Sequence, residues 1–455
     1  MKSRALIFVV VVLISLISAL ISVFLSFDHL NMLLLLIFVC LLIVLFVPIL
    51  NSRDIFHPNS FVVVVFIYLY LFPLMYYMND DSGLEGFGFH SISANDLRVG
   101  LIYIIIALSL YLIGQAFFNN FIGKSNRKGR VYSLNKQFNL NENLINKAIV
   151  IFTVVGILCF LYLGFIAIGI DTLLNSFYQA KQSLSGNYYF VWGVELFLIA
   201  SLLMLFKNKP NLKIVFIHLI VGLLMISIFG SRGKIFYYLI VFLAIYHYRW
   251  KRISFKKGLV FAVVAVSMAA LIYSFRVVSS EGISLSSFSD VIDAWFSGSE
   301  FRMLDMYVLV LRDSGLMYPH NFGSDYLNLF TSFIPRSIWQ DKPVSIDIPL
   351  TQFYLPLREA GIPPTLIGAM YHNFNIFGIL IGMFLIGLIS SWVYSIKNKS
   401  SLHLSFYSVF IVMLFSYLRI GDFNQVAMFG LKMFLPILVI LLANTYFNRK
   451  RSFNG

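Results

Sequence analysis

Long uninterrupted apolar runs dominate the chain, and polar residues are confined to the short segments between them. The run from Ala5 to Phe27 is apolar on all sides, so it has neither the polar face of a surface helix nor the alternation of a membrane β-strand. A helix crosses a hydrocarbon core of roughly 30 Å with about 20 residues, and backbone groups in lipid must pair internally. The pattern therefore predicts a bundle of membrane-spanning α-helices.

Runs of suitable length and apolarity are predicted to be spans. They lie near residues 5–27, 30–50, 61–78, 98–122, 147–169, 188–206, 213–230, 235–249, 259–275, 376–396, 402–420 and 424–446. The first run is longer than the apolar core of a signal peptide and lacks a small-residue cleavage site, so we expect it to be retained. The predicted fold is an all-α, polytopic transmembrane bundle of about twelve spans.

Basic residues fall on every second connection between the predicted spans. The basic connections hold Lys2 and Arg4; Arg53; Lys124, Arg127, Lys128, Arg130 and Lys136; Lys207, Lys209 and Lys213; Arg249 to Lys257; Lys397 and Lys399; and Arg449 to Arg451. The alternate connections are acidic or sparse in charge, and the segment 79–97 contains no Lys or Arg. Because Lys and Arg accumulate in cytoplasmic loops, we expect both termini in the cytoplasm.

One long connection then lies on the outer face, and it divides the chain into three parts. Residues 1–275 hold the first nine spans, residues 276–375 form the large periplasmic loop, and residues 376–455 hold the last three spans and a cytoplasmic C-terminus. The loop is too rich in aromatic and aliphatic residues to be disordered, and the run Arg302–Arg312 is typical of a helix. We expect a small ordered cap, because loops of this length are usually functional.

Composition matters mainly for what it excludes. Hydrophobic residues make up 59% and charged residues 12% of the chain, which leaves too little polar surface for a soluble globule. The net charge of +14 could indicate nucleic-acid binding, but the basic residues flank the spans as cytoplasmic anchors do, so we expect no nucleic-acid partner. Cys40 and Cys159 lie inside apolar runs, so no disulfide framework or metal site follows from them. The motifs of soluble enzymes are absent.

Cations on the predicted outer face are the first candidates for chemistry, because the positive-inside rule depletes them there. They are Arg232 and Lys234 in a Gly-Ser-Arg-Gly-Lys hairpin, Arg276 at the end of the ninth span, and Arg419 in a turn with Asp422. Lipid phosphates could occupy the hairpin, snorkelling could explain Arg276, and an ion pair with Asp422 could explain Arg419. The functional interpretation is an anionic ligand such as a diphosphate, which guanidinium groups bind through paired N–H donors.

Two segments of the long loop add further candidates. One contains Arg336, Trp339 and Lys342 between prolines, which could form a cationic and aromatic platform for a sugar phosphate or simply a packed turn with surface charges. The other contains His372 and Asn373 where the loop returns to the membrane. Polar groups are costly at that boundary unless they are used, although a lone histidine often only packs.

Two ionisable residues, Glu195 and His218, fall inside predicted spans. Such residues are candidates for function by default, and a hydrogen bond within the bundle is the equally acceptable alternative.

Taken together, the chain resembles the O-antigen, or oligosaccharide repeat-unit, polymerases of bacterial surface polysaccharide pathways, commonly called Wzy. The resemblance covers the whole chain in its spans, its orientation and the large loop before the last three spans. The local matches are Arg53 to Pro58, the Gly-Ser-Arg-Gly hairpin at 230–233, the Pro-Arg to Lys-Pro stretch at 335–343, and the segment from Pro364 to Gly378. Members often have Gly-Glu-Leu where this chain has Gly368-Ala369-Met370, so a role for that glutamate is not carried over.

The resemblance implies a GT-C-like glycosyltransferase of the bacterial inner membrane. It would transfer the growing polymer from undecaprenyl diphosphate to a new lipid-linked repeat unit at the periplasmic face, next to membrane lipids and with a chain-length regulator as partner. An O-antigen ligase or a flippase for lipid-linked oligosaccharides are the alternatives.

Catalytic and binding roles follow from this chemistry. Arg336 would hold the diphosphate, and His372 would accept the proton of the acceptor hydroxyl, with His320 and the acidic residues of the loop as alternatives. The substrate-binding candidates are Arg232, Lys234, Arg276, Arg419, Trp339, Lys342 and Asn373. We expect no cofactor, and no metal if arginine stabilises the leaving group.

Overall fold

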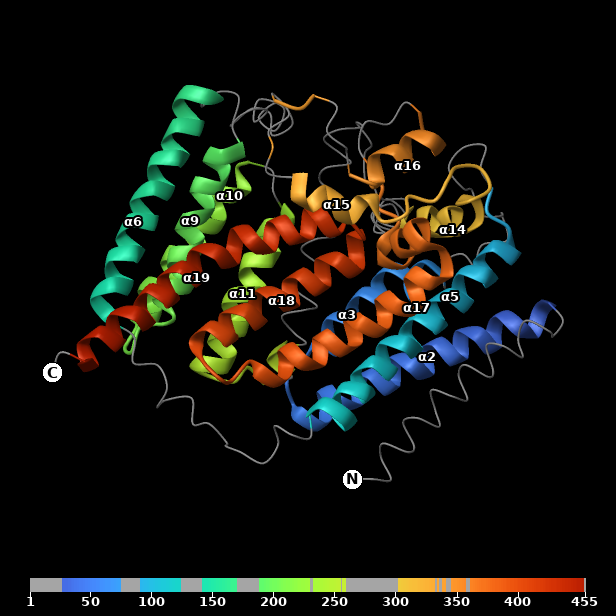
Figure 1. Ribbon diagram of the computed structural model, residues 1–455, viewed down its shortest axis with the longest axis horizontal. Coiled ribbons are helices and arrows are strands. Elements are labelled where there is room, and N and C mark those ends of the chain that lie inside the picture. The colour runs from blue at the N-terminus through green and yellow to red at the C-terminus, as the bar shows by residue number, and fades with distance from the viewer. Residues whose placement is uncertain are drawn as a thin grey trace, which may run out of the picture. The chain divides into compact units, whose positions relative to one another are not determined.

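The structure is a computed structural model. It describes residues 27–74, 91–123, 141–169, 188–229, 232–254, 256–258, 302–331, 334, 338–340, 345–356 and 361–453. Within these ranges the regular elements are helices and no sheet forms, which confirms the all-α prediction (Figure 1). The predicted spans 5–27 and 259–275 lie outside the described residues, apart from Phe27 at the start of a helix.

The remaining predicted spans coincide with helices. These are α2 (Phe27–Ser52), α3 (Pro58–Phe66) with its continuation η1 (Ile67–Leu71), α5 (Ala94–Phe117) with η2 (Phe118–Ile122), α6 (Glu142–Leu161) with η5 (Tyr162–Ala167), α9 (Tyr188–Met204), α10 (Leu212–Ser227), α11 (Arg232–Arg249), α17 (Thr365–Ile396), α18 (Ser401–Ile420) and α19 (Phe423–Phe453). Among the described residues, 6 helical segments are long and apolar enough to cross a bilayer on their own: Leu33–Ser52, Ala94–Ile122, Glu142–Ala167, Thr365–Ile396, Ser401–Ile420 and Phe423–Asn444. The chain is therefore a multi-pass membrane protein, while the full set of twelve spans stays a prediction.

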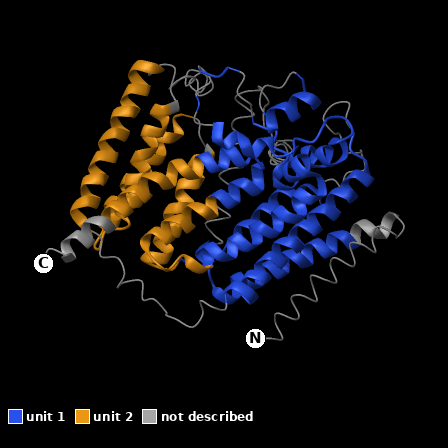
Figure 2. Ribbon diagram, viewed as in Figure 1, with its two compact units in different colours: residues 1–128, 253–394, 413–428 blue, residues 129–252, 395–412, 429–455 orange. Residues whose placement is uncertain are grey.

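The helices form two compact units (Figure 2). The first contains residues 1–128, 253–394 and 413–428, and the second contains residues 129–252, 395–412 and 429–455. Helices α18 and α19 each contribute residues to both units.

In the first unit, α5 and α17 pack backbone against backbone at two glycines. A Cβ atom on Gly387 would lie 2.0 Å from the carbonyl oxygen of Tyr111, and one on Gly114 would lie 2.1 Å from that of Phe384. Membrane helices commonly use small residues for such close approach. The hydrophobic effect does not drive helices together in lipid, so their association relies on close van der Waals packing. Any larger residue at either position would force these two helices apart.

The Arg53 to Pro58 segment, which contributed to the family resemblance, forms the turn into α3 in this unit. Asp54 accepts hydrogen bonds from the Phe56 amide at 3.1 Å and from the Tyr394 hydroxyl at 2.9 Å. His57 caps α3 by accepting from the Asn59 amide at 3.2 Å. The His57 contact satisfies one of the amides that a helix start leaves unpaired, and the Asp54 contacts fix the turn before it.

The described part of the long loop packs into the first unit. It contains α14 (Arg302–Asp313), α15 (Ser324–Thr331) and α16 (Asp347–Tyr354), shown in the upper part of Figure 1. Helix α14 confirms the helix predicted from Arg302 to Arg312. Its Tyr307 is fully buried and donates a hydrogen bond to the Gly100 carbonyl of α5 at 2.7 Å. This part of the loop is therefore anchored to the helical unit.

A helical segment that the sequence did not predict precedes the tenth span. Helix α17 begins at Thr365, directly after Pro363-Pro364, and its part beyond residues 374–375 begins at residue 376, where the span was predicted to start. Proline fits just before and at the first positions of a helix, where its missing N–H costs nothing. A kink at residues 374–375, where φ is −139° and then 54°, divides α17 in two. His372 and Asn373 therefore lie inside a helical segment and not in a connecting loop.

In the second unit, His218 of α10 is satisfied within the bundle. Its ring nitrogens lie 2.7 Å from the Ser201 hydroxyl and 3.1 Å from the Thr153 hydroxyl. The ring also stacks on Phe197 at 3.9 Å between centroids. Of the two alternatives for this residue, the hydrogen bond within the bundle is the one that the structure contains.

Candidate functional site

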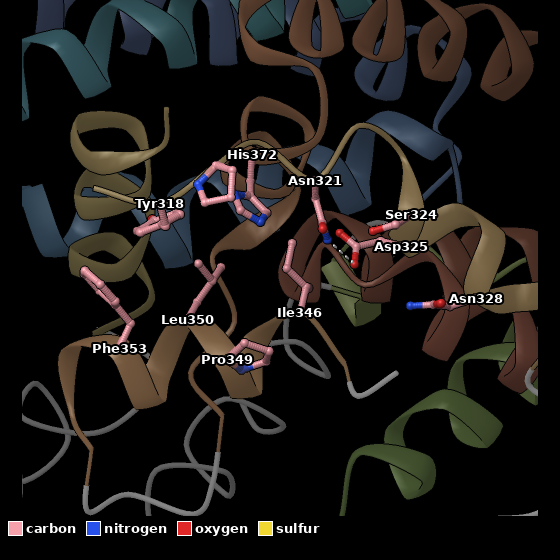
Figure 3. Close-up of a pocket in the computed structure, with 11 residues that line it drawn as sticks. Tyr318, Asn321, Ser324, Asp325, Asn328, Ile346, Pro349, Leu350, Phe353 and His372 are labelled. Atoms are coloured by element: carbon pink, nitrogen blue, oxygen red, sulfur yellow. Dashed lines mark hydrogen bonds between the residues drawn. The ribbon is translucent and has the colours of Figure 1, made fainter. Parts of the chain in front are cut away.

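A cavity of about 430 Å³ lies in the first unit beside the first segment of α17 (Figure 3). It is lined by Tyr318, Pro319, Asn321, Ser324, Asp325, Asn328, Ile346, Pro349, Leu350, Phe353 and His372. The polar lining residues come from the start of α15 and the turn before it, and the apolar ones come mostly from α16. The volume lies in the range of about 300–1,000 Å³ that small-molecule sites occupy.

Asp325 is the charged residue of the cavity wall, and two amides hold its carboxylate. Asn321 donates to Oδ1 at 2.8 Å, and Asn373 of α17 donates to Oδ2 at 2.8 Å. Burial raises the pKa of Asp325, while these two hydrogen bonds oppose the rise. The carboxylate is therefore fixed in position and faces the cavity.

Asn373 ties the start of α15 to α17 through its other contacts. It is buried, its Oδ1 accepts from the Gly323 amide at 3.1 Å, and its Nδ2 also donates to the Ala369 carbonyl at 2.9 Å. Because both polar atoms of its side chain are hydrogen-bonded, Asn373 positions Asp325. Asn373 itself does not line the cavity, whereas Asp325 and His372 do.

His372 presents its ring to the cavity. Its Nδ1 lies 3.3 Å from the Ser314 hydroxyl, and its ring lies edge-on to Tyr318 at 5.5 Å. Its backbone carbonyl accepts from the Asn321 amide at 3.0 Å and lies 3.1 Å from Nδ1 of His320. No hydrogen bond to Nε2 of His372 comes from the part of the chain that the structure describes. Within the described residues, Nδ1 is therefore the ring nitrogen that has a hydrogen-bond partner.

Polar contacts from the end of α14 support the wall of the cavity that Tyr318 forms. Arg312 pairs with Asp313 at 2.7 Å, the Tyr354 hydroxyl lies 2.9 Å from Asp313, and the Tyr318 hydroxyl lies 3.1 Å from that of Tyr354. The hydrogen bond to Asp313 raises the pKa of Arg312, and the carboxylate of Asp313 compensates the guanidinium charge. Arg312 therefore supports this wall through Asp313 and is not among the residues that line the cavity.

The predicted cations are distributed over several parts of the chain. Arg276, Arg336 and Lys342 lie outside the described residues. Arg232 begins α11, Arg419 is half-buried in the last turn of α18, and Trp339 is half-buried in the loop. Asp422 next to Arg419 caps α19, accepting from the Gln425 amide at 3.0 Å, and it also accepts from the Ser345 hydroxyl at 2.5 Å.

Lys234 forms an ion pair in the second unit. Its Nζ lies 2.5 Å from Oε1 of Glu195, which is 3% exposed, and the Tyr238 hydroxyl donates to Oε2 at 3.1 Å. Lys432 interacts electrostatically with both charges of this pair. Much of the Lys234 charge is therefore compensated by Glu195, which weakens its case as a phosphate ligand.

We expect Lys234→Met to destabilise the protein by about 3 kcal/mol, the lower end for a buried pair, because Lys432 stays near the orphaned Glu195. The double variant Glu195→Gln with Lys234→Met should recover part of the lost Tm, since it removes the orphaned carboxylate but leaves Lys432 without its attraction to Glu195. Thermal unfolding in detergent measures both effects. A single variant as stable as the wild type would show that the pair does not support the fold.

Of the predicted site, the structure brings together His372 and Asn373 and adds residues that the sequence did not single out, namely Asp325, Asn321, Ser314 and Tyr318. Asp325 was only one among several loop acids, and its partner Asn373 is 48 residues away. Within the described ranges, no group of three His, Cys, Asp or Glu residues could hold a metal ion.

The comparisons with known proteins agree with the resemblance. The family described as O-antigen polysaccharide polymerase Wzy matches residues 5–451, nearly the whole chain. We found no significant match among curated proteins or solved structures. A match over this length includes both units and the described cap. The chain therefore belongs to the Wzy family of O-antigen polysaccharide polymerases.

Proposed function

We propose that this protein extends a surface polysaccharide by joining lipid-linked repeat units at the outer face of the bacterial inner membrane. The bond between the anomeric carbon of the growing polymer and its undecaprenyl diphosphate breaks. A glycosidic bond forms between that carbon and a hydroxyl oxygen of the acceptor repeat unit. The hydroxyl proton passes to a base, and undecaprenyl diphosphate leaves as the anion.

The observation that carries this proposal is the cavity beside His372 in a member of the polymerase family. A sugar ring has an apolar C–H face and a rim of hydroxyl groups. Leu350 and Phe353 offer an apolar surface, while Asp325 and Asn328 offer hydrogen-bonding groups on the other side (Figure 3). Such amphipathic lining suits a saccharide better than it suits a wholly apolar ligand.

His372 is our candidate for the base. In the tautomer in which Nδ1–H donates to the Ser314 hydroxyl, the lone pair of Nε2 is available in the cavity. A general base must lie within hydrogen-bond reach of the proton it takes, and an acceptor hydroxyl in the cavity would satisfy this condition. Neutral imidazole is the form that accepts a proton. His320 is the second candidate.

Cations would stabilise the diphosphate leaving group. Our candidates are Arg336 as the catalytic cation in the cap, together with Arg232, Arg276, Arg419 and Lys342, and with Trp339 as an aromatic platform. Guanidinium groups stay charged and match diphosphate oxygens in pairs, and charge placed where the leaving group develops lowers the barrier. A reaction supported in this way would need no metal ion.

The proposed topology has twelve spans in a GT-C-like arrangement with both termini in the cytoplasm. The alternation of basic connections supports it, and it places the cavity and His372 on the periplasmic side. Reporter fusions after residues 210, 320 and 398 would test this topology, and a cytoplasmic result at 320 would rule out the proposed site.

The polysaccharide profile of a deletion strain tests the function itself. Loss of a polymerase leaves single repeat units attached to the lipid core, loss of a ligase attaches none, and loss of a flippase retains the units on the cytoplasmic face. We expect the first pattern, with a full ladder restored by the wild-type chain. A chain-length regulator would be the partner that sets the length of that ladder. Either of the other two patterns would replace polymerisation with the corresponding alternative.

A further inference from the structure

An exposed apolar surface lies on the side of α15 that faces away from the cavity. Leu327 and Phe330 are 65% and 77% exposed, and Phe322 just before the helix is 78% exposed. Residues three apart share one face of a helix. On the other side of the same helix, Asp325 and Asn328 line the cavity. Helix α15 therefore has one side toward the cavity and one exposed apolar side.

Helix α17 carries an exposed apolar stripe that leads to this surface. Its members are Phe377, Ile381, Leu385, Ile389 and Trp392, and the exposed Phe374 precedes them at the kink. Their spacing of three and four residues follows one face of a helix, and the helix is one of the candidate spans. Such a stripe on a span faces lipid.

The stripe meets α15 at Phe374. The Phe374 ring stacks on Tyr326 of α15, with 6.0 Å between centroids and 16° between planes. Gly323 precedes α15 with φ +83°, and a Cβ there would lie 2.6 Å from the Phe374 ring, so only glycine allows this approach. The apolar side of α15 therefore adjoins the outer end of a lipid-facing surface.

We propose that α15 lies in the outer-leaflet interface, with Phe322, Leu327 and Phe330 among the acyl chains. Burying apolar area gains about 25 cal/mol per Å², so large side chains this exposed favour a non-aqueous environment. Short amphipathic helices typically enter about 5–10 Å into the boundary between headgroups and chains. Continuity with the α17 stripe identifies lipid as the occupant of this face.

This placement has a consequence that rests on the proposed function. The cavity would be separated from lipid by a single helix, a thickness of about 10 Å. A saccharide could then occupy the cavity while its diphosphate remains at headgroup level and its polyprenyl chain remains in the membrane. The substrate would reach the site sideways from the bilayer without being extracted into water.

Spin labels test the lipid contact directly. Single cysteines at Leu327→Cys or Phe330→Cys, in a background of Cys40→Ser and Cys159→Ala, would carry a nitroxide in bilayers of phosphatidylethanolamine and phosphatidylglycerol. Collisions with oxygen report lipid, and collisions with a nickel chelate report water. Ile381→Cys on the α17 stripe is the lipid control, and Asn208→Cys, exposed between α9 and α10, is the water control.

We expect the ratio of oxygen to chelate collisions at 327 and 330 to match that at 381 and to exceed that at 208 several-fold. A ratio like that at 208 would place this face in water. Low collision rates with both reagents would mean that protein, such as a second copy of the chain, covers it. Either result overturns the proposal. The measurement needs no substrate, so its outcome is separate from the test of polymerase function.

Discussion

Replacing His372 by glutamine should lower the rate of repeat-unit transfer by about 10²–10⁴, the usual contribution of a positioned general base. Glutamine can still form hydrogen bonds in the cavity wall, but it cannot take a proton from the acceptor hydroxyl. Ser314 and Tyr318 hold the histidine ring from one side, so the loss should appear in turnover more than in protein stability. The measurement is the rate of polymer growth in vitro on lipid-linked repeat units, with the glycan ladder of a complemented strain as a second readout.

Two other histidines provide the comparison for this result. His403→Gln removes an imidazole that is bonded to Ser400 near the start of α18, and it should leave transfer unchanged. His320→Gln removes the neighbour whose Nδ1 lies 3.1 Å from the His372 carbonyl, and it should reduce transfer only partly. Full activity of His372→Gln would leave His372 with a packing role, and a loss confined to His320→Gln would transfer the role of base to that residue.

The sequence predicted the long apolar helices among the described residues because each of them carries its own signal. An apolar run of about 20 residues is sufficient to identify a span, as for the helices α5 and α6. The part of α17 beyond the kink at residues 374–375 was predicted, whereas its first part from Thr365 was not predicted as a helix, because the segment 365–373 contains polar residues. Buried hydrogen bonds make these polar residues compatible with a helix, and such partners are not visible in a local pattern.

The candidate site was harder to predict from the sequence than the helices, because it depends on contacts between residues that are distant along the chain. His372 and Asn373 were predicted as site residues because polar side chains at a membrane boundary are costly unless they have a function. Asp325 could not be distinguished from other loop acids, because its importance comes from the amide of Asn373, 48 residues along the chain. Likewise the sequence did not reveal that Glu195, 39 residues before Lys234, compensates much of the charge of that lysine. Pairings at such separations require the fold itself.

Replacing Asp325 by asparagine should raise the KM for the acceptor repeat unit by about 10- to 100-fold. A hydrogen bond to a charged group contributes about 1.5–3 kcal/mol, and each 1.4 kcal/mol corresponds to about a tenfold change in affinity. Turnover at saturating acceptor should change less, since the carboxylate holds the acceptor before and during transfer alike. The Tm should fall only modestly, because asparagine can still accept one of the two amide hydrogen bonds that Asn321 and Asn373 donate to the carboxylate, and a typical hydrogen bond contributes about 0.5–1.5 kcal/mol.

The pH dependence gives this prediction a second test with a defined sign. Burial raises the pKa of Asp325, so the carboxylate that binds the acceptor is lost as pH falls through a value above the ordinary 3.8. Acceptor affinity should therefore weaken on the acid side in the wild type, and Asp325→Asn should lack that part of the profile. Asp347→Asn is the matched control, since burial also raises the pKa of Asp347 but this residue does not line the cavity. An unchanged KM in Asp325→Asn, or an equal rise in both variants, would show that Asp325 only supports the cavity wall and does not bind the acceptor.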